Sequence, residues 1–225
     1  MRRYSADYEL EKVVEVDIRG LRLEGNLVTP ASARGIVAFA HGSGSSRHSS
    51  RNRFVASELN RAGLATLLFD LLTPEEEEVD LRTHHLRFNI PLLAQRVVGA
   101  VDWIRRESDL MDLNVGLFGA STGAAAALMA AADRPGDVGA VVSRGGRPDL
   151  AGDALPLAQA PTLLIVGGDD VMVIDLNREA YDRMTVAERR MTIVPGAGHL
   201  FEEAGKLDEV ARLATEWFAE HLQEQ

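Results

Sequence analysis

The sequence predicts an α/β fold built on an eight-stranded, mostly parallel sheet that is flanked by helices. Short, nearly continuous apolar runs recur along the chain and alternate with helical segments. This alternation is typical of βαβ units, whose strands are buried on both faces. Residues 13–29 differ, because apolar and polar residues alternate there on either side of Arg19 and Gly20. That pattern predicts an antiparallel hairpin at one edge of the sheet.

The elements follow in chain order. The hairpin strands are expected at residues 13–18 and 21–29. Buried strands are expected at 35–40, 65–69, 114–118, 139–142, 162–166 and 191–194. Helices are expected near 52–62, 90–107, 121–132, 176–184 and 207–223. The connection 71–89 contains the acidic run 75–78, which is most simply a solvated loop or a first helical turn; a partial lid is the alternative.

Composition limits the function classes. The chain has 225 residues, a net charge of −10 and no cysteine. The negative charge argues against a nucleic-acid partner, and the absence of cysteine excludes disulfides and thiolate metal sites and fits a cytoplasmic protein. No apolar run is long enough to span a membrane, and the first residues lack the apolar core of a signal peptide. No nucleotide-binding glycine motif and no His-Glu-x-x-His pattern occur, so we expect neither a cofactor nor a metal.

The most informative motif is Gly119-Ala120-Ser121-Thr122-Gly123, which lies between an expected strand and an alanine-rich helix. A serine on such a sharp turn is exposed at the edge of the sheet, where it can attack a carbonyl carbon. A helix N-cap is the alternative role for Ser121.

Two further residues stand where a nucleophilic serine would need them. Such a serine requires a base and an acid that orients the base. His199 follows the last expected strand, and Asp170 follows the strand at 162–166 with the spacing Gly167-x-x-Asp. We therefore expect a Ser121–His199–Asp170 triad at the carboxyl edge of the sheet, with Asp169 as the alternative acid.

The glycine-rich turn 41–46 (HGSGSS) follows the first parallel strand. Attack by Ser121 creates an anion that needs backbone N–H donors. We expect these from the amide of Thr122 and the amide of Ser43, with Gly44 as the alternative to Ser43. His41 is expected to brace this loop.

Three arginines fall near the same edge of the sheet: Arg47, Arg51 and Arg144. They are candidates for binding a substrate carboxylate. Salt bridges that shape the loops are the alternative, and the sequence favours it.

Several stretches together resemble the dienelactone-hydrolase-like branch of the α/β-hydrolase superfamily, from about Gly35 to the C-terminus: HGSGSSRHSSRN, LFDLLTPEE, GLFGASTGAAAAL, VVSRGGRPDLAG, PTLLIVGGDD and PGAGHLFEE. The resemblance implies an α/β-hydrolase fold and places the family's triad on Ser121, Asp170 and His199. Family members that carry a cap domain insert it after the strand at 139–142; the interval before 162 is short, so we expect no cap and a single domain over residues 1–225. Some relatives are fused to a phosphoribosyltransferase domain, which we do not expect in this chain.

One departure from the family pattern bears on the substrate. Dienelactone hydrolases proper have a cysteine in the elbow, where this chain has Ser121. We therefore expect a serine hydrolase of small or short-acyl carboxylic esters and not of dienelactone itself. The alternatives are an acyltransferase with the same triad and a non-catalytic scaffold that binds a ligand or partner.

Overall fold

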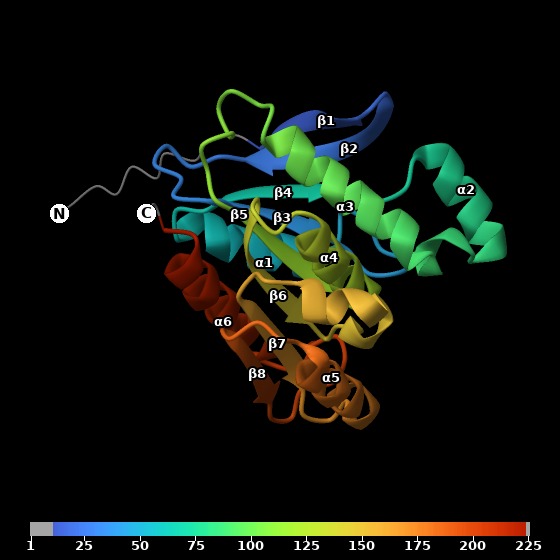
Figure 1. Cartoon of the computed structure of the whole chain (residues 1–225), viewed down its shortest axis with the longest axis vertical. Coiled ribbons are helices and arrows are strands. Elements are labelled where there is room, and N and C mark those ends of the chain that lie inside the picture. Colours follow the sequence, from blue (N-terminus) through green and yellow to red (C-terminus); the bar gives the residue numbers. More distant parts are fainter. Residues whose placement is uncertain (1–10, 224–225) are drawn as a thin grey trace.

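The computed structural model describes residues 11–223, so the ends of the predicted 1–225 domain lie outside the described residues. One eight-stranded sheet has the strand order β1-β2-β4-β3-β5-β6-β7-β8 (Figure 1). The pairs β1–β2 and β2–β4 are antiparallel, and all other neighbouring strands are parallel. The strands are β1 (Lys12–Ile18), β2 (Leu21–Val28), β3 (Ile36–Ala40), β4 (Ala65–Phe69), β5 (Val115–Ala120), β6 (Val138–Arg144), β7 (Thr162–Gly167) and β8 (Arg189–Val194).

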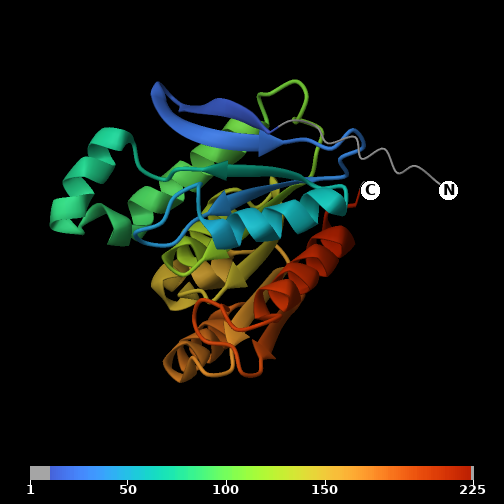
Figure 2. The ribbon, with the colours of Figure 1, turned by 180° about the vertical axis from the view of Figure 1, so that it is seen from behind.

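Helices cover both faces of this sheet. Helices α3 (Ile90–Ile104), α4 (Thr122–Asp133) and α5 (Val171–Arg183) and the 3-10 segment η2 (Pro148–Leu157) lie on the face seen in Figure 1. Helices α1 (Ser50–Arg61) and α6 (Lys206–His221) lie side by side on the opposite face, which Figure 2 shows. The predicted layered arrangement of strands and helices is therefore present.

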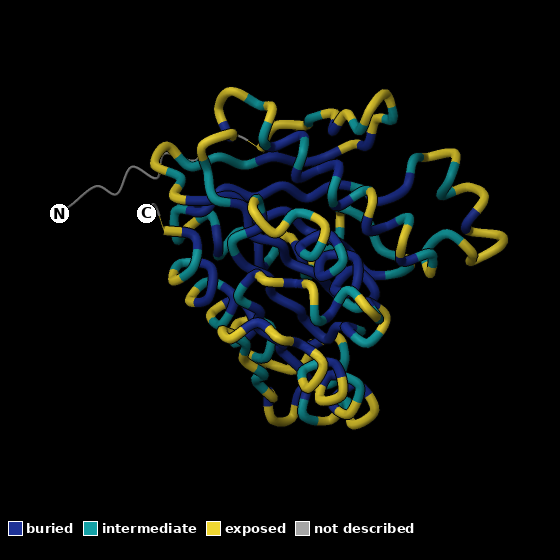
Figure 3. Tube along the Cα trace, viewed as in Figure 1, coloured by how far each residue is buried: buried dark blue, intermediate teal, exposed yellow. Residues whose placement is uncertain are grey.

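The apolar runs of β3, β4, β5, β6 and β7 are buried on both faces, as their lack of alternation predicts. The expectation of a buried strand at 191–194 is wrong, because β8 is the edge strand of the sheet, pairs only with β7 and leaves Ile193 exposed. In β3, Ile36, Ala38 and Ala40 pack into the cluster under α3 and α4, whereas Val37 and Phe39 pack into the cluster under α1 and α6. The central strands β3 to β7 are accordingly buried along nearly their whole length (Figure 3). Within the described residues, no helix combines the length and the apolarity that a membrane crossing requires.

The connection 71–89 forms helix α2 (Pro74–Thr83) and the 3-10 turn η1 (Leu86–Phe88), which project to one side of the sheet (Figure 1). The acidic run is the first turn of α2, where a capping box between Thr73 and Glu76 starts the helix. The carboxylate of the buried Asp80 accepts hydrogen bonds from the amides of Leu86 and Arg87 and pairs with the Arg87 guanidinium. Polar contacts thus hold α2 in place, which explains why apolar periodicity did not predict it.

Between β6 and β7 the chain forms only η2 and its flanking loops. This agrees with the expectation that no cap domain is inserted there. The carboxyl ends of β3, β5, β6, β7 and β8 therefore meet at an edge with no added domain over it.

Candidate active site

Ser121 lies between the end of β5 and the start of α4, on a sharply turned backbone with φ 51° and ψ −122°. A positive φ at a residue other than glycine is strained, and such strain concentrates at functional sites. The side chain of Ser121 makes no capping hydrogen bond to α4. The geometry therefore favours the nucleophile elbow over a helix N-cap.

The two glycines of the elbow are required by close packing. A Cβ atom on Gly119 would lie 2.7 Å from the backbone nitrogen of Ala124, and one on Gly123 would lie 2.6 Å from the carbonyl oxygen of His41. Both distances are far inside van der Waals contact, and both neighbours are backbone atoms. The elbow can form only with glycine on each side of Ser121.

The loops after β7 and β8 bring an acid and an imidazole together. Nδ1 of His199 lies 2.7 Å from Oδ2 of Asp170. The backbone fixes the two loops against each other, because the amide of Asp169 donates to the carbonyl of Ala197 at 3.0 Å. Asp169 itself is exposed, so the structure places Asp170, not Asp169, beside the histidine.

His199 is also close to the elbow. A Cβ atom on Gly145, the residue after β6, would lie 3.6 Å from Nδ1 of His199. The residue before it, Arg144, accepts a hydrogen bond from the amide of Ser121 through its carbonyl oxygen, at 3.3 Å. Among the described residues, Ser121 and His199 share no direct hydrogen bond; in free enzymes such catalytic bonds are often long and shorten when substrate binds.

The amide of Ser43 lies beside the elbow but already has an acceptor. It donates to Oγ1 of Thr122 at 3.0 Å, across 79 positions of sequence. Thr122 is the first residue of α4 and is buried. The hydroxyl of Thr122 thus holds Ser43 near Ser121, a contact between distant residues that no sequence pattern indicates.

His41 braces the same loop, as expected from the sequence. Its Nε2 accepts a hydrogen bond from the amide of Leu71 at 3.1 Å, and its Nδ1 lies 3.0 Å from the carbonyl oxygen of Gly42. These contacts require the neutral tautomer with the proton on Nδ1. Burial lowers the pKa of His41 below 6.5 and outweighs the Gly42 contact and the carboxylates of Asp70 and Glu77, which raise it.

Comparisons with known proteins identify the family. Residues 23–223 match the Dienelactone hydrolase family. The chain belongs to the dienelactone hydrolase family. The crystal structure of dienelactone hydrolase from Anabaena variabilis has 60% sequence identity and a TM-score of 0.93, covering 95% of this chain and 99% of that chain. The predicted α/β-hydrolase fold and family resemblance are thereby confirmed.

One further solved structure and two curated relatives are also similar to this chain. Est1E from Butyrivibrio proteoclasticus shares the fold at 16% identity, with a TM-score of 0.76 over 93% of this chain and 98% of that one. Two Mycobacterium tuberculosis proteins, provisionally named phosphoribosyl transferases, are 55% identical over 94% of this chain. This chain spans 47% of the length of those two relatives.

The three arginines singled out in this family member have different surroundings. Arg47 forms ion pairs with Asp70 and Glu24, and its Nε donates to Oδ1 of Asn26. These contacts support the alternative role for Arg47, a salt bridge that shapes the loop. Arg51 forms one ion pair, with Glu202, and Arg144 donates one side-chain hydrogen bond, to Oδ1 of Asn52.

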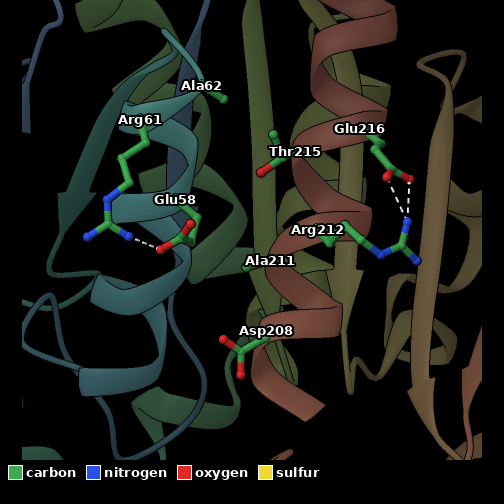
Figure 4. A pocket seen from close by; sticks show the side chains of 8 residues that line it. All are labelled: Glu58, Arg61, Ala62, Asp208, Ala211, Arg212, Thr215 and Glu216. Carbon is green, nitrogen blue, oxygen red and sulfur yellow. Dashed lines mark hydrogen bonds and ion pairs between the residues drawn. The ribbon is translucent and has the colours of Figure 1, made fainter. Parts of the chain in front are cut away.

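Two hollows in the surface do not contain the candidate triad. One, of about 180 Å³, lies between the loop 41–47 and the start of α2. A larger one, of about 460 Å³, lies between α1 and α6 (Figure 4). Its arginines are paired within their own helices, Arg61 with Glu58 and Arg212 with Glu216. In the described part of the family member, no group of three or more potential ligating side chains (His, Cys, Asp or Glu) could hold a metal ion.

Proposed function

We propose that this member of the dienelactone hydrolase family is a serine hydrolase of carboxylic esters that works through an acyl-enzyme. The observation that carries the proposal is the 2.7 Å contact between Asp170 and His199, next to a serine on a strained elbow. Esterases recur among the structural neighbours with the same fold, which fits the proposal without naming a substrate.

Each member of the triad has a defined role. Ser121 attacks the ester carbonyl and gives its proton to Nε2 of His199. Asp170 holds Nδ1–H of His199, which fixes the tautomer and stabilises the charged imidazolium. His199 then protonates the leaving alcohol, and water activated by the same histidine hydrolyses the acyl-enzyme.

The developing oxyanion is assigned to the amides of Thr122 and Ser43. Because Ser43 donates to the Thr122 hydroxyl in the free protein, its amide must exchange this acceptor for the oxyanion during attack. One such donor lowers the barrier by about 3 kcal/mol in comparable sites. The open edge, without a cap, suits small or short-acyl esters.

A fluorophosphonate probe tests the nucleophile directly. We expect the wild-type protein to be labelled at Ser121 and to hydrolyse p-nitrophenyl acetate. Ser121→Ala should lose both, with a rate reduction of about 10⁴-fold or more. Ser46→Ala, in the neighbouring loop, is the matched control and should keep both.

The outcomes separate the competing functions. Labelling at another residue, or hydrolysis that persists in Ser121→Ala, would refute the nucleophile. No labelling of a folded wild-type protein would favour the non-catalytic scaffold. Formation of a new ester or amide in the presence of an added alcohol or amine, in preference to hydrolysis, would favour the acyltransferase.

A further inference from the structure

Arg144 is a buried cation at the end of β6, next to the elbow. Only 6% of its surface is exposed. One of its terminal nitrogens donates to Oδ1 of Asn52 in α1 at 3.2 Å, while its Nε is buried without an acceptor. Among residues 11–223, no carboxylate lies within ion-pair distance of it. Burying a charge without a counter-ion is costly, so the position calls for an explanation beyond packing.

The neighbouring charged group, the guanidinium of Arg51, adds a second positive charge beside Arg144. Burial and the neighbouring guanidinium of Arg51 lower the pKa of Arg144 to about 10, so Arg144 still carries its proton at neutral pH. Arg51 lies in the first turn of α1, where the aligned backbone N–H groups add positive potential. Two guanidinium groups and a helix N-terminus therefore lie near one another.

A single exposed carboxylate offsets them. Nη1 of Arg51 lies 2.8 Å from Oε1 of Glu202, whose side chain is 64% exposed, while Nε of Arg51 is buried without an acceptor. Glu202 follows His199 by three residues. The carboxylate thus binds at the solvent side of the pair and leaves Arg144 uncompensated.

Three other arginines near this edge of the sheet, unlike Arg144, have carboxylate partners. Arg47 pairs with Asp70 and Glu24, Arg87 with Asp80, and Arg147 with Asp149. The unpaired cation coincides with the strand end that contacts the nucleophile, because the amide of Ser121 donates to the carbonyl of Arg144.

We propose that Arg144, Arg51 and the first turn of α1 form a subsite for an anionic group, a carboxylate or a phosphate, carried by the ester substrate. Glu202 occupies Arg51 in the free protein, and the anion of the substrate replaces it. The inference rests on the proposed function, because it names the substrate class of the same site.

Direct binding tests the subsite without using catalysis. In Ser121→Ala, succinate and inorganic phosphate are titrated separately by calorimetry. We expect at least one of them to bind, and binding to weaken about tenfold or more when Arg144→Gln or Arg51→Gln is added. Glu202→Gln should tighten binding, since it removes the competing carboxylate. Arg53→Gln, an exposed arginine of the same helix that pairs with Glu11, is the matched control and should bind as before.

The relative affinities for the two anions show which anionic group the substrate carries. Tighter binding of phosphate than of succinate points to a phosphorylated substrate, and the reverse points to a carboxylate. Absence of binding by both at 10 mM, or equal affinity in the arginine variants, would overturn the subsite. Arg51 lies partly at the surface, so we expect Arg51→Gln to fold. This variant decides the question if Arg144→Gln does not fold.

Kinetics in the otherwise wild-type protein provide the second arm. p-Nitrophenyl hemisuccinate is compared with p-nitrophenyl butyrate, which has the same leaving group and no charge. Arg144→Gln should raise KM for the hemisuccinate about tenfold relative to KM for the butyrate; equal losses on both esters would assign Arg144 a purely structural role. If the wild-type protein hydrolyses neither ester, the proposed function fails, while the calorimetric result still decides the subsite.

Discussion

Gly123→Ala tests whether the elbow depends on the close approach of its second glycine to β3. A Cβ atom at this position would lie 2.6 Å from the carbonyl oxygen of His41 and closer still to that of Ala40. An ordinary carbon–oxygen contact is about 3.3 Å, so the backbone of the elbow or of β3 must move by about 0.7 Å or more. Neither neighbour is a flexible side chain that could turn away.

The expected cost follows from that displacement. Overpacking against a fixed neighbour costs about 1–3 kcal/mol in general, and here we expect about 3 kcal/mol because both partners are backbone. A shift of this size also moves Ser121 relative to the loop that starts at His41. Misplacement by about 1 Å can reduce catalysis about 10²-fold, so activity should fall more than stability alone explains.

Gly136→Ala is the matched control. A Cβ atom there meets nothing within 4 Å, and its φ is not positive. This substitution should be neutral or stabilise by about 0.5 kcal/mol through the unfolded state. Urea unfolding and hydrolysis of p-nitrophenyl acetate are measured for both variants. If Gly123→Ala matches Gly136→Ala in both measurements, the steric account of the elbow is wrong.

Two further predictions concern the acid and the oxyanion loop. Asp170→Asn should reduce ester hydrolysis about 10⁴-fold because His199 loses its tautomer-fixing partner, whereas Asp169→Asn should stay within about twofold; similar losses in both would contradict the assignment. Because the pKa of His41 is lowered in the folded protein, His41 binds a proton near pH 6.5 in the unfolded chain but stays neutral at that pH in the folded chain. Stability is therefore fully present above pH 6.5 and falls as the pH drops toward the folded-state pKa. His41→Gln should flatten this decline in urea midpoints measured at pH 7, 6 and 5, and an unchanged slope would show that another group is responsible.

The sequence predicted the sheet well because buried parallel strands have a simple signature. The apolar runs at 65–69 and 162–166 coincide with β4 and nearly coincide with β7. The runs at 114–118 and 139–142 end before their strands do, since β5 continues to Ala120 and β6 to Arg144. Glycine, serine and arginine close these two strands, and only pairing with neighbouring strands keeps such residues in the sheet.

The helices show where apolar pattern gives no information. Helix α5 begins at Val171, five residues before the expected start, and its first two side chains are exposed, Val171 at 67% and Met172 at 70%. Apolar residues that face solvent have no periodic partner to reveal them. Helix α2 buries only Asp80, a charged residue, so polar contacts and not an apolar stripe define it.

The candidate triad could be placed from sequence because topology alone brings the ends of β5, β7 and β8 to one edge. The partners of a charged side chain cannot be placed in that way. Arg47 and Arg144 look alike in the sequence, yet one is held by two carboxylates and the other by a single amide oxygen. The net charge of −10 gives no hint of the difference, because electrostatic interactions are local and most of the acidic groups are too far away to neutralise a buried cation. Among the described residues, Arg144 thus has no carboxylate partner beside the candidate nucleophile, and the anionic group that it lacks is the group that the proposed substrate would supply.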